Sequence, residues 1–215
     1  MKLVVISSPD LLHTEVNTVV NLFRDGLNTF HLRKPKFDRE RMEEYLLAIP
    51  KEFRSRIVLH SHHSLAIKYK LHGIHLTRKH RQKNWGGLRL LWMKLRHSRM
   101  IVTRTYHRLI DLDNIPKRYA YVFLSPVFES ISSGSRKRYS RSAISKTLSA
   151  TRTSIYALGG ISVDTIPEAK ALGFAGAAIH GAMWNGQQDH TTYLKQAKSK
   201  AREAFATQPK QELQD

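Results

Sequence analysis

The sequence contains no cysteine, which excludes disulfide bonds, thiolate metal ligands and a cysteine nucleophile. Acidic residues are scarce as well, since 17 Asp and Glu stand against 36 Lys and Arg and give a formal net charge of +19. The deficit is concentrated between Phe53 and Ile110, a stretch that holds no Asp or Glu at all. A surface of this sign attracts anions, so we expect an anionic partner.

The chain also lacks a long apolar run. The opening run of residues 1–6 turns polar at Ser7, which is too short for a signal peptide or a membrane span. We therefore expect a cytoplasmic protein without membrane contact. Nucleic acid is the obvious anion for a basic chain, but the basic residues are spread over several predicted elements and match no nucleic-acid module. We expect it not to be the partner, and the sequence allows a homo-oligomer.

Short apolar runs alternate with amphipathic stretches along 215 residues, a length at which α/β barrels fold as one domain. Eight runs are predicted strands: 3–7, 29–32, 57–61, 73–76, 100–103, 121–125, 154–158 and 177–180. Predicted helices cover 13–23, 38–49, 64–71, 86–97, 141–148, 166–172 and 191–205, with a short turn at 110–115 in place of one helix. This order predicts a single (β/α)8 TIM barrel over residues 1–206, followed by a polar, frayed tail at 207–215.

The last two predicted strands both end in glycine. Residues 156–161 read YALGGI, residues 176–182 read GAAIHGA, and residues 162–164 are predicted to cap the helix between them. In α/β barrels the loops after the last two strands frequently bind phosphate through backbone N–H groups, and glycine lets the ligand approach closely. Gly160 and Gly181 are therefore candidate phosphate ligands, although a tight turn alone would also use glycine.

Five segments, taken together, resemble thiamine-phosphate synthase and the related TenI-type thiazole tautomerases. They are 31–35 (HLRKP), 73–76 (GIHL), 121–130 (YVFLSPVFES), 158–161 (LGGI) and 176–183 (GAAIHGAM), in the family's order and spacing. The resemblance implies a transferase that couples hydroxymethylpyrimidine diphosphate to a thiazole phosphate, expelling diphosphate with the help of Mg²⁺. Gly160 and Gly181 would then hold the thiazole phosphate.

The resemblance also implies a diphosphate site after the second strand, where the family has Gln-Leu-Arg-Glu-Lys. Here His31 stands at the Gln position, Arg33 at the Arg, Lys34 at the Glu and Pro35 at the Lys. Arg33 keeps the planar fork that suits phosphate. Lys34 could replace the missing cation, although strand alternation would point its side chain the other way.

The carboxylates that hold Mg²⁺ in the family are replaced. Ser61 takes the place of the Asp after the third strand, and Lys79 or His80 takes the place of the acid after the fourth. Since Mg²⁺ prefers carboxylate oxygens in octahedral geometry, we expect the usual metal site to be lost. Fixed cations could screen the diphosphate instead. A histidine site formed by His60, His62 and His63 is disfavoured, because such neighbours point in different directions.

The resemblance yields a set of candidate ligands for the two phosphorylated substrates but no assigned catalytic residue. Two alternatives stay open: a binding or regulatory relative that lost catalysis, and a TenI-type tautomerase, whose catalytic His position holds Pro126. His75 is predicted to be a satisfied core histidine, and His180 either reaches the pocket or packs in the core. The candidate ligands are His31, Arg33, Lys34, His60, Thr105, Ser130, Ser132, Gly160 and Gly181.

Overall fold

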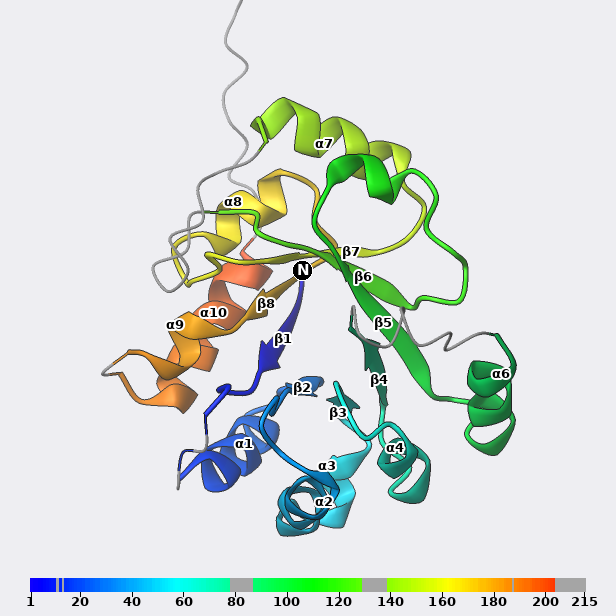
Figure 1. Cartoon of the computed structure of the whole chain (residues 1–215). Coiled ribbons are helices and arrows are strands. Elements are labelled where there is room, and N and C mark those ends of the chain that lie inside the picture. Colours follow the sequence, from blue (N-terminus) through cyan, green and yellow to red (C-terminus); the bar gives the residue numbers. More distant parts are fainter. Residues whose placement is uncertain (11, 13, 78–86, 129–138, 187, 204–215) are drawn as a thin grey trace, which may run out of the picture.

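Eight parallel strands close into a barrel in the computed structural model (Figure 1). The structure describes all residues except 11, 13, 78–86, 129–138, 187 and 204–215. Each strand pairs with the next one in sequence, and β8 pairs with β1, which confirms the predicted (β/α)8 barrel. The strands are β1 (Lys2–Ile6), β2 (Phe30–Leu32), β3 (Ile57–Leu59), β4 (Gly73–Leu76), β5 (Ile101–Tyr106), β6 (Tyr121–Leu124), β7 (Ile155–Leu158) and β8 (Gly176–Ile179).

Helices connect the strands and lie around the outside of the barrel (Figure 1). Within the described part of the chain, none is long and apolar enough to cross a membrane. The helices are α1 (Glu15–Arg24), α2 (Arg39–Ala48), α3 (Lys51–Arg54), α4 (Ser64–Lys68), α6 (Gly87–Arg96), the 3₁₀ helix η1 (Leu109–Leu112), α7 (Arg141–Ala150), α8 (Ile166–Ala171), α9 (Gly181–Trp184) and α10 (His190–Arg202).

Side-chain caps mark the starts of α2 and α10. Asp38 accepts a hydrogen bond from the amide of Arg41 (2.9 Å) at the start of α2, and Asp189 accepts from the amide of Thr192 (2.8 Å) at the start of α10. The short element predicted at 110–115 is present as η1. The single-turn helices α3 and α9 were not predicted, because four residues are too few to show a helical period.

The barrel interior is divided into an apolar half and a polar half. Strands β6, β7, β8 and β1 contribute the apolar half, whereas β2 to β5 contribute three histidines and two threonines. A separate, larger core lies between the strands and the outer helices. The apolar interior residues are Val4, Ile6, Tyr121, Phe123, Tyr156 and Ala178, and the polar ones are His31, His60, His75, Thr103 and Thr105.

Gly176 is required by close packing inside this barrel. A Cβ at this position would lie 2.5 Å from the ring of Tyr156, which stacks on Tyr121 with ring centroids 4.3 Å apart. Because real Cβ atoms do not approach so closely, β8 can begin beside Tyr156 only with glycine. The first glycine of the GAAIHGA segment is thus explained by packing.

Candidate functional site

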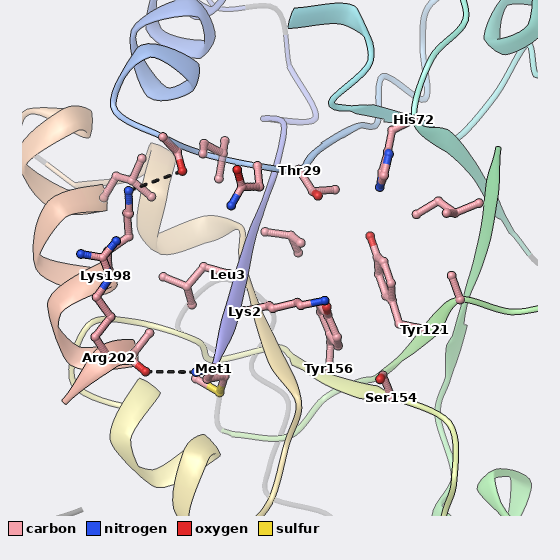
Figure 2. A pocket seen from close by; sticks show the side chains of 18 residues that line it. Met1, Lys2, Leu3, Thr29, His72, Tyr121, Ser154, Tyr156, Lys198 and Arg202 are labelled. Carbon is pink, nitrogen blue, oxygen red and sulfur yellow. Dashed lines mark hydrogen bonds between the residues drawn. The ribbon is translucent and has the colours of Figure 1, made fainter. Parts of the chain in front are cut away.

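The carboxyl ends of the strands bring several predicted residues to one mouth of the barrel. Arg33 follows β2, Ser61 follows β3, Gly160 follows β7 and Gly181 follows β8. This is the end at which enzymes of this fold carry their active sites. A pocket of about 520 Å³ lies at the opposite end, lined by strand starts and by α10 (Figure 2). We place the candidate site at the carboxyl-end mouth, because the predicted residues and the active sites of this fold lie at that end.

Arg33 presents its side chain to solvent while its backbone is held in place. The buried hydroxyl of Ser7 accepts a hydrogen bond from the Arg33 amide (2.8 Å) and donates one to the Arg33 carbonyl (2.9 Å). Ser7 follows β1, so this contact fixes the end of β2 against its neighbour. A charged fork on a fixed backbone is suited to binding a phosphate group.

His180 lies within reach of the Arg33 charge. Burial lowers the pKa of His180, and the Arg33 guanidinium lowers it further, which keeps the imidazole neutral at pH 7. Its Nε2 atom is buried and has no hydrogen-bond partner among the residues that the structure describes. Because His180 precedes Gly181, the cation of Arg33 and the glycine that ends β8 lie at the same part of the mouth.

The glycines after β7 adopt backbone conformations that other residues rarely take. Gly159 and Gly160 have φ angles of +89° and +67°, and a Cβ on Gly159 would lie 2.9 Å from Cα of Pro126. The Thr165 hydroxyl donates to the Gly160 carbonyl (2.9 Å) and accepts from the Ser162 amide (2.8 Å). These bonds hold the loop in a fixed shape.

The assigned N-cap of α8 is Thr165, one residue after the segment predicted to cap it, but the Ser162 hydroxyl accepts from the Thr165 amide (3.4 Å), so the predicted segment does bond the start of the helix. Outside regular helix and strand bonding, the amides of Gly160 and Gly181 donate no hydrogen bond within the described part of the chain. Two N–H groups at neighbouring strand ends are thus free to meet an anion.

Lys34 does not reach the mouth. Its side chain is fully buried outside the barrel and forms a salt bridge with the carboxylate of Glu15 at the start of α1. The ammonium also donates to the carbonyl of Asp10 (2.6 Å), and the Tyr45 hydroxyl donates to Glu15 (3.1 Å). The expectation that Lys34 replaces the family's lysine is therefore not supported, because strand alternation turns it away from the ligand.

His31, His60 and Thr105 lie below the mouth, inside the barrel. His31 Nδ1 and His60 Nε2 are 3.0 Å apart, and His31 Nε2 is 2.6 Å from the hydroxyl of Tyr121. Burial raises the pKa of Tyr121, so its hydroxyl stays protonated and donates to His31 Nε2. His31 must then donate from Nδ1 to His60.

The second part of this network is His75. Its Nδ1 is 2.9 Å from the Thr103 hydroxyl and its Nε2 is 3.2 Å from the Thr105 hydroxyl. Thr103 donates to a backbone carbonyl (3.4 Å), so it accepts from Nδ1 while Thr105 donates to Nε2. The prediction of a satisfied core histidine is confirmed for His75. Burial, together with the neighbouring imidazole of His75, lowers the pKa of both His31 and His60 well below 6.5, which favours neutral rings.

The sequence did not indicate Ser7 or Tyr121 as partners of the predicted residues, and it left open whether His180 reaches the pocket or packs in the core. The sequence feature that marks all three is their position, since each lies at an inward-facing position of a strand or directly after a strand. Ser130, Ser132, Lys79 and His80 lie outside the described residues.

The described residues do not fit the Mg²⁺ ion that the family resemblance implies. The position after β3 offers only the hydroxyl of Ser61, which is buried and without a hydrogen-bond partner in the described part. Among the residues described, the single group of three or more metal-ligating side chains consists of histidines. Nitrogen donors of this kind do not suit Mg²⁺, so we derive no step through that ion.

These features define a (β/α)8 barrel whose candidate ligand site lies at the carboxyl-end mouth, between a fixed arginine and two glycine-ended strands. The family model described as thiamine monophosphate synthase matches residues 3–183, and the chain belongs to this family. No curated protein sequence matches the chain significantly.

Solved structures share the fold of this chain. The thiamine phosphate pyrophosphorylase of Bacteroides thetaiotaomicron is 29% identical, with a TM-score of 0.73 over 94% of this chain and 98% of that one. The enzyme of the same name from Pyrococcus furiosus is 17% identical, with a TM-score of 0.74 over 93% and 95%. The (S)-3-O-geranylgeranylglyceryl phosphate synthase of Thermoplasma acidophilum shares the fold at 12% identity, with a TM-score of 0.66 over 94% of each chain.

Proposed function

We propose that this protein is a thiamine-phosphate synthase that joins hydroxymethylpyrimidine diphosphate to a thiazole phosphate. Membership of the family and the 29% identity to a thiamine phosphate pyrophosphorylase support this activity. The observation that carries the proposal is the meeting of Arg33, His180 and the glycine ends of β7 and β8 at one mouth. It offers a cation for a diphosphate beside backbone N–H groups for a phosphate.

In this proposal the amides of Gly160 and Gly181 hold the thiazole phosphate. Arg33 pairs with the diphosphate of the other substrate. The bond between the pyrimidine methylene carbon and the diphosphate oxygen breaks, and its electron pair leaves with the diphosphate. The thiazole nitrogen supplies the pair that forms the new carbon–nitrogen bond. Arg33 assists because its charge meets the negative charge that develops on the leaving group.

The direct test incubates the tag-free protein with both substrates, with and without Mg²⁺, and quantifies thiamine phosphate by chromatography. We expect product above the no-enzyme control. Arg33→Gln should lower kcat/KM about tenfold or more, in keeping with the loss of a charge-assisted contact of about 1.5–3 kcal/mol. The matched control is Lys36→Gln, which removes an exposed cation from the same loop and should keep the activity. Absence of product in every condition would refute the synthase.

A second function, phosphate-ligand binding without catalysis, is favoured by Ser61. A neutral hydroxyl stands where the family has its Mg²⁺ carboxylate, so the chemistry can be lost while the glycine loops still bind. Calorimetry with thiazole phosphate and with thiamine phosphate separates the two functions. Binding without turnover supports the second function, and turnover removes it.

A further inference from the structure

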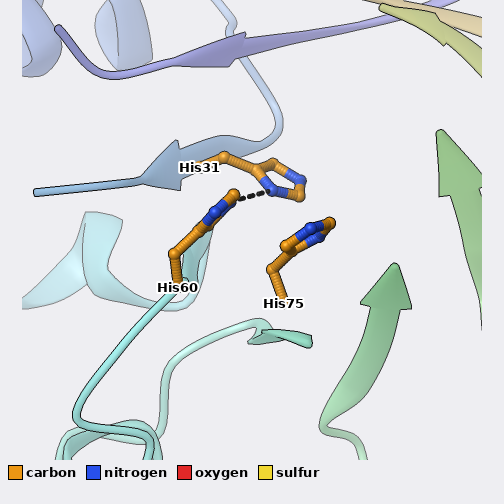
Figure 3. A group of neighbouring side chains, drawn as sticks. All are labelled: His31, His60 and His75. Carbon is orange, nitrogen blue, oxygen red and sulfur yellow. Dashed lines mark hydrogen bonds between the residues drawn. The ribbon is translucent and has the colours of Figure 1, made fainter. Parts of the chain in front are cut away.

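Three consecutive strands each send one histidine into the barrel interior (Figure 3). His31 lies in β2, His60 directly follows β3, and His75 lies in β4. One ring nitrogen from each lies within 4.8 Å of the others. We propose that His31, His60 and His75 form a binding site for a divalent transition-metal ion of the zinc type, distinct from the family's Mg²⁺ position.

Strand register explains why the rings meet. Val58 pairs with Gly73, so His60 and His75, each two residues further along, lie side by side. Their rings stack with centroids 4.2 Å apart. His31 approaches from the other neighbour of β3, with its Nδ1 at 3.0 Å from His60 Nε2. The pairing of the strands therefore fixes the positions of the three rings.

The distances between the ring nitrogens are close to those between the ligand atoms of a metal centre. Zinc–nitrogen bonds of about 2.0–2.1 Å in a tetrahedron place neighbouring ligand nitrogens about 3.3 Å apart. The His31–His60 pair, at 3.0 Å, needs to open only slightly. The third imidazole has to tilt inward from a separation of at most 4.8 Å, which side-chain rotation can supply.

The outer nitrogens of His31 and His75 already have oxygen partners. When His31 Nδ1 binds the metal, Nε2–H can donate to the Tyr121 hydroxyl at 2.6 Å. Whichever nitrogen of His75 binds, the other meets a threonine hydroxyl, at 2.9 Å from Thr103 or 3.2 Å from Thr105. Metal-ligating histidines almost always donate their second N–H to such an oxygen, which fixes the ring orientation.

The donor set defines the class of ion. Three buried imidazoles, exposed by 0%, 7% and 4%, suit Zn²⁺, Co²⁺, Ni²⁺ or Cu²⁺ and not Mg²⁺ or Ca²⁺. Three protein ligands leave a fourth position for water or an anion. His60 stands where β3 ends at the mouth, so the ion would enter from that side. The site requires neither substrate of the proposed synthase, and it can be tested independently.

The competing reading is a hydrogen-bond network that only fills the polar half of the barrel. In that network a proton lies between His31 and His60, whereas in the metal site the cation replaces it. The two readings differ in metal content. The measurement uses tag-free, full-length protein that is stripped with a chelator, incubated with excess ZnCl₂, dialysed, and analysed for zinc by mass spectrometry.

We expect one zinc per chain, and His60→Ala and His75→Ala should each abolish this stoichiometry. The matched control His107→Ala removes an exposed histidine at the same end of the barrel and should retain one zinc. Circular dichroism checks that the variants fold. As a measurement that needs no variant, Co²⁺ loaded into the unmodified protein should show the intense visible absorption of four-coordinate cobalt.

Tyr121→Phe tests the outer contact. It keeps the ring and removes the hydroxyl from His31 Nε2, so zinc affinity should fall about tenfold to a hundredfold while the fold is retained. Less than about a tenth of a zinc per chain in the unmodified protein would overturn the proposal. Retention of a full zinc by both folded His60→Ala and His75→Ala would also overturn it, since the ion would then lie elsewhere.

Discussion

The buried salt bridge between Lys34 and Glu15 should contribute more to folding than to ligand binding. Both side chains are fully buried, and the ammonium also donates to a backbone carbonyl at 2.6 Å. At an effective dielectric constant of about 20, two unit charges about 3 Å apart attract by about 5 kcal/mol. Each ion also loses several kcal/mol of hydration, so the net value of the pair is far smaller than this attraction.

Removal of one partner leaves the other charge buried. Lys34→Met should therefore lower the free energy of unfolding by about 3–5 kcal/mol at pH 8. Burial already raises the pKa of Glu15, and loss of the lysine removes an influence that lowers it. The carboxyl of the variant then takes up a proton as the pH falls, and the loss should shrink toward pH 5. The double variant Glu15→Met/Lys34→Met should lose less than the sum of the two single variants.

Urea unfolding followed by circular dichroism measures this effect as a midpoint shift of about 1–2 M, for an m value of about 2–3 kcal/mol/M. Calorimetry with thiazole phosphate supplies the functional comparison, in which Lys34→Met should bind within about threefold of the unmodified protein. A Lys34→Met protein of unchanged stability whose ligand affinity falls tenfold would refute the reasoning. Lys34 would then be a phosphate ligand, as the sequence comparison had suggested.

Three further perturbations test the mouth and the core. Gly159→Ala forces a side chain onto a left-handed backbone and should lower the free energy of unfolding, measured in urea, by at least about 1–2 kcal/mol. The control Gly186→Ala, whose Cβ would lie 3.7 Å from the nearest atom, should lower it by less than about 1 kcal/mol. Trp184→Phe leaves a carbonyl of β1 without its 2.6 Å hydrogen bond and should cost about 1–3 kcal/mol, against little change for the half-exposed Trp92→Phe. Because the pKa of His60 is lowered in the fold, its contribution is fully present above pH 6.5. As the pH falls below 6.5, the free energy of unfolding of the metal-free protein should fall by up to about 1.4 kcal/mol per pH unit through this residue. The same dependence of stability on pH in His60→Gln would contradict this assignment.

The barrel itself was predictable because each strand is a short apolar run bounded by polar or glycine residues. The alternation of side chains also indicated that Lys34 would face away from the mouth, and the structure agrees. What a single sequence does not carry is the register between strands. His60 and His75 are 15 positions apart in the chain, and only the pairing of Val58 with Gly73 brings their rings together.

The same limit explains why the cluster was not visible in the sequence. The histidine group that the sequence analysis weighed and disfavoured was His60, His62 and His63, of which only His60 belongs to the cluster. His62 instead bonds the carbonyl of Phe37 at 3.0 Å. In parallel barrels, side chains paired across neighbouring strands point to the same face at a spacing of about 4.8 Å, whereas successive side chains along one segment diverge.

The polar half of the barrel interior gives this protein its own spectroscopic probe. The His31 ring lies between Tyr121 and His60, with no exposed surface, so the proton on its Nδ1 exchanges with water only when the interior opens. A proton that exchanges slowly gives a separate NMR resonance. Its chemical shift and exchange rate would follow both the occupancy of the mouth and the opening of the barrel, without any label attached to the chain.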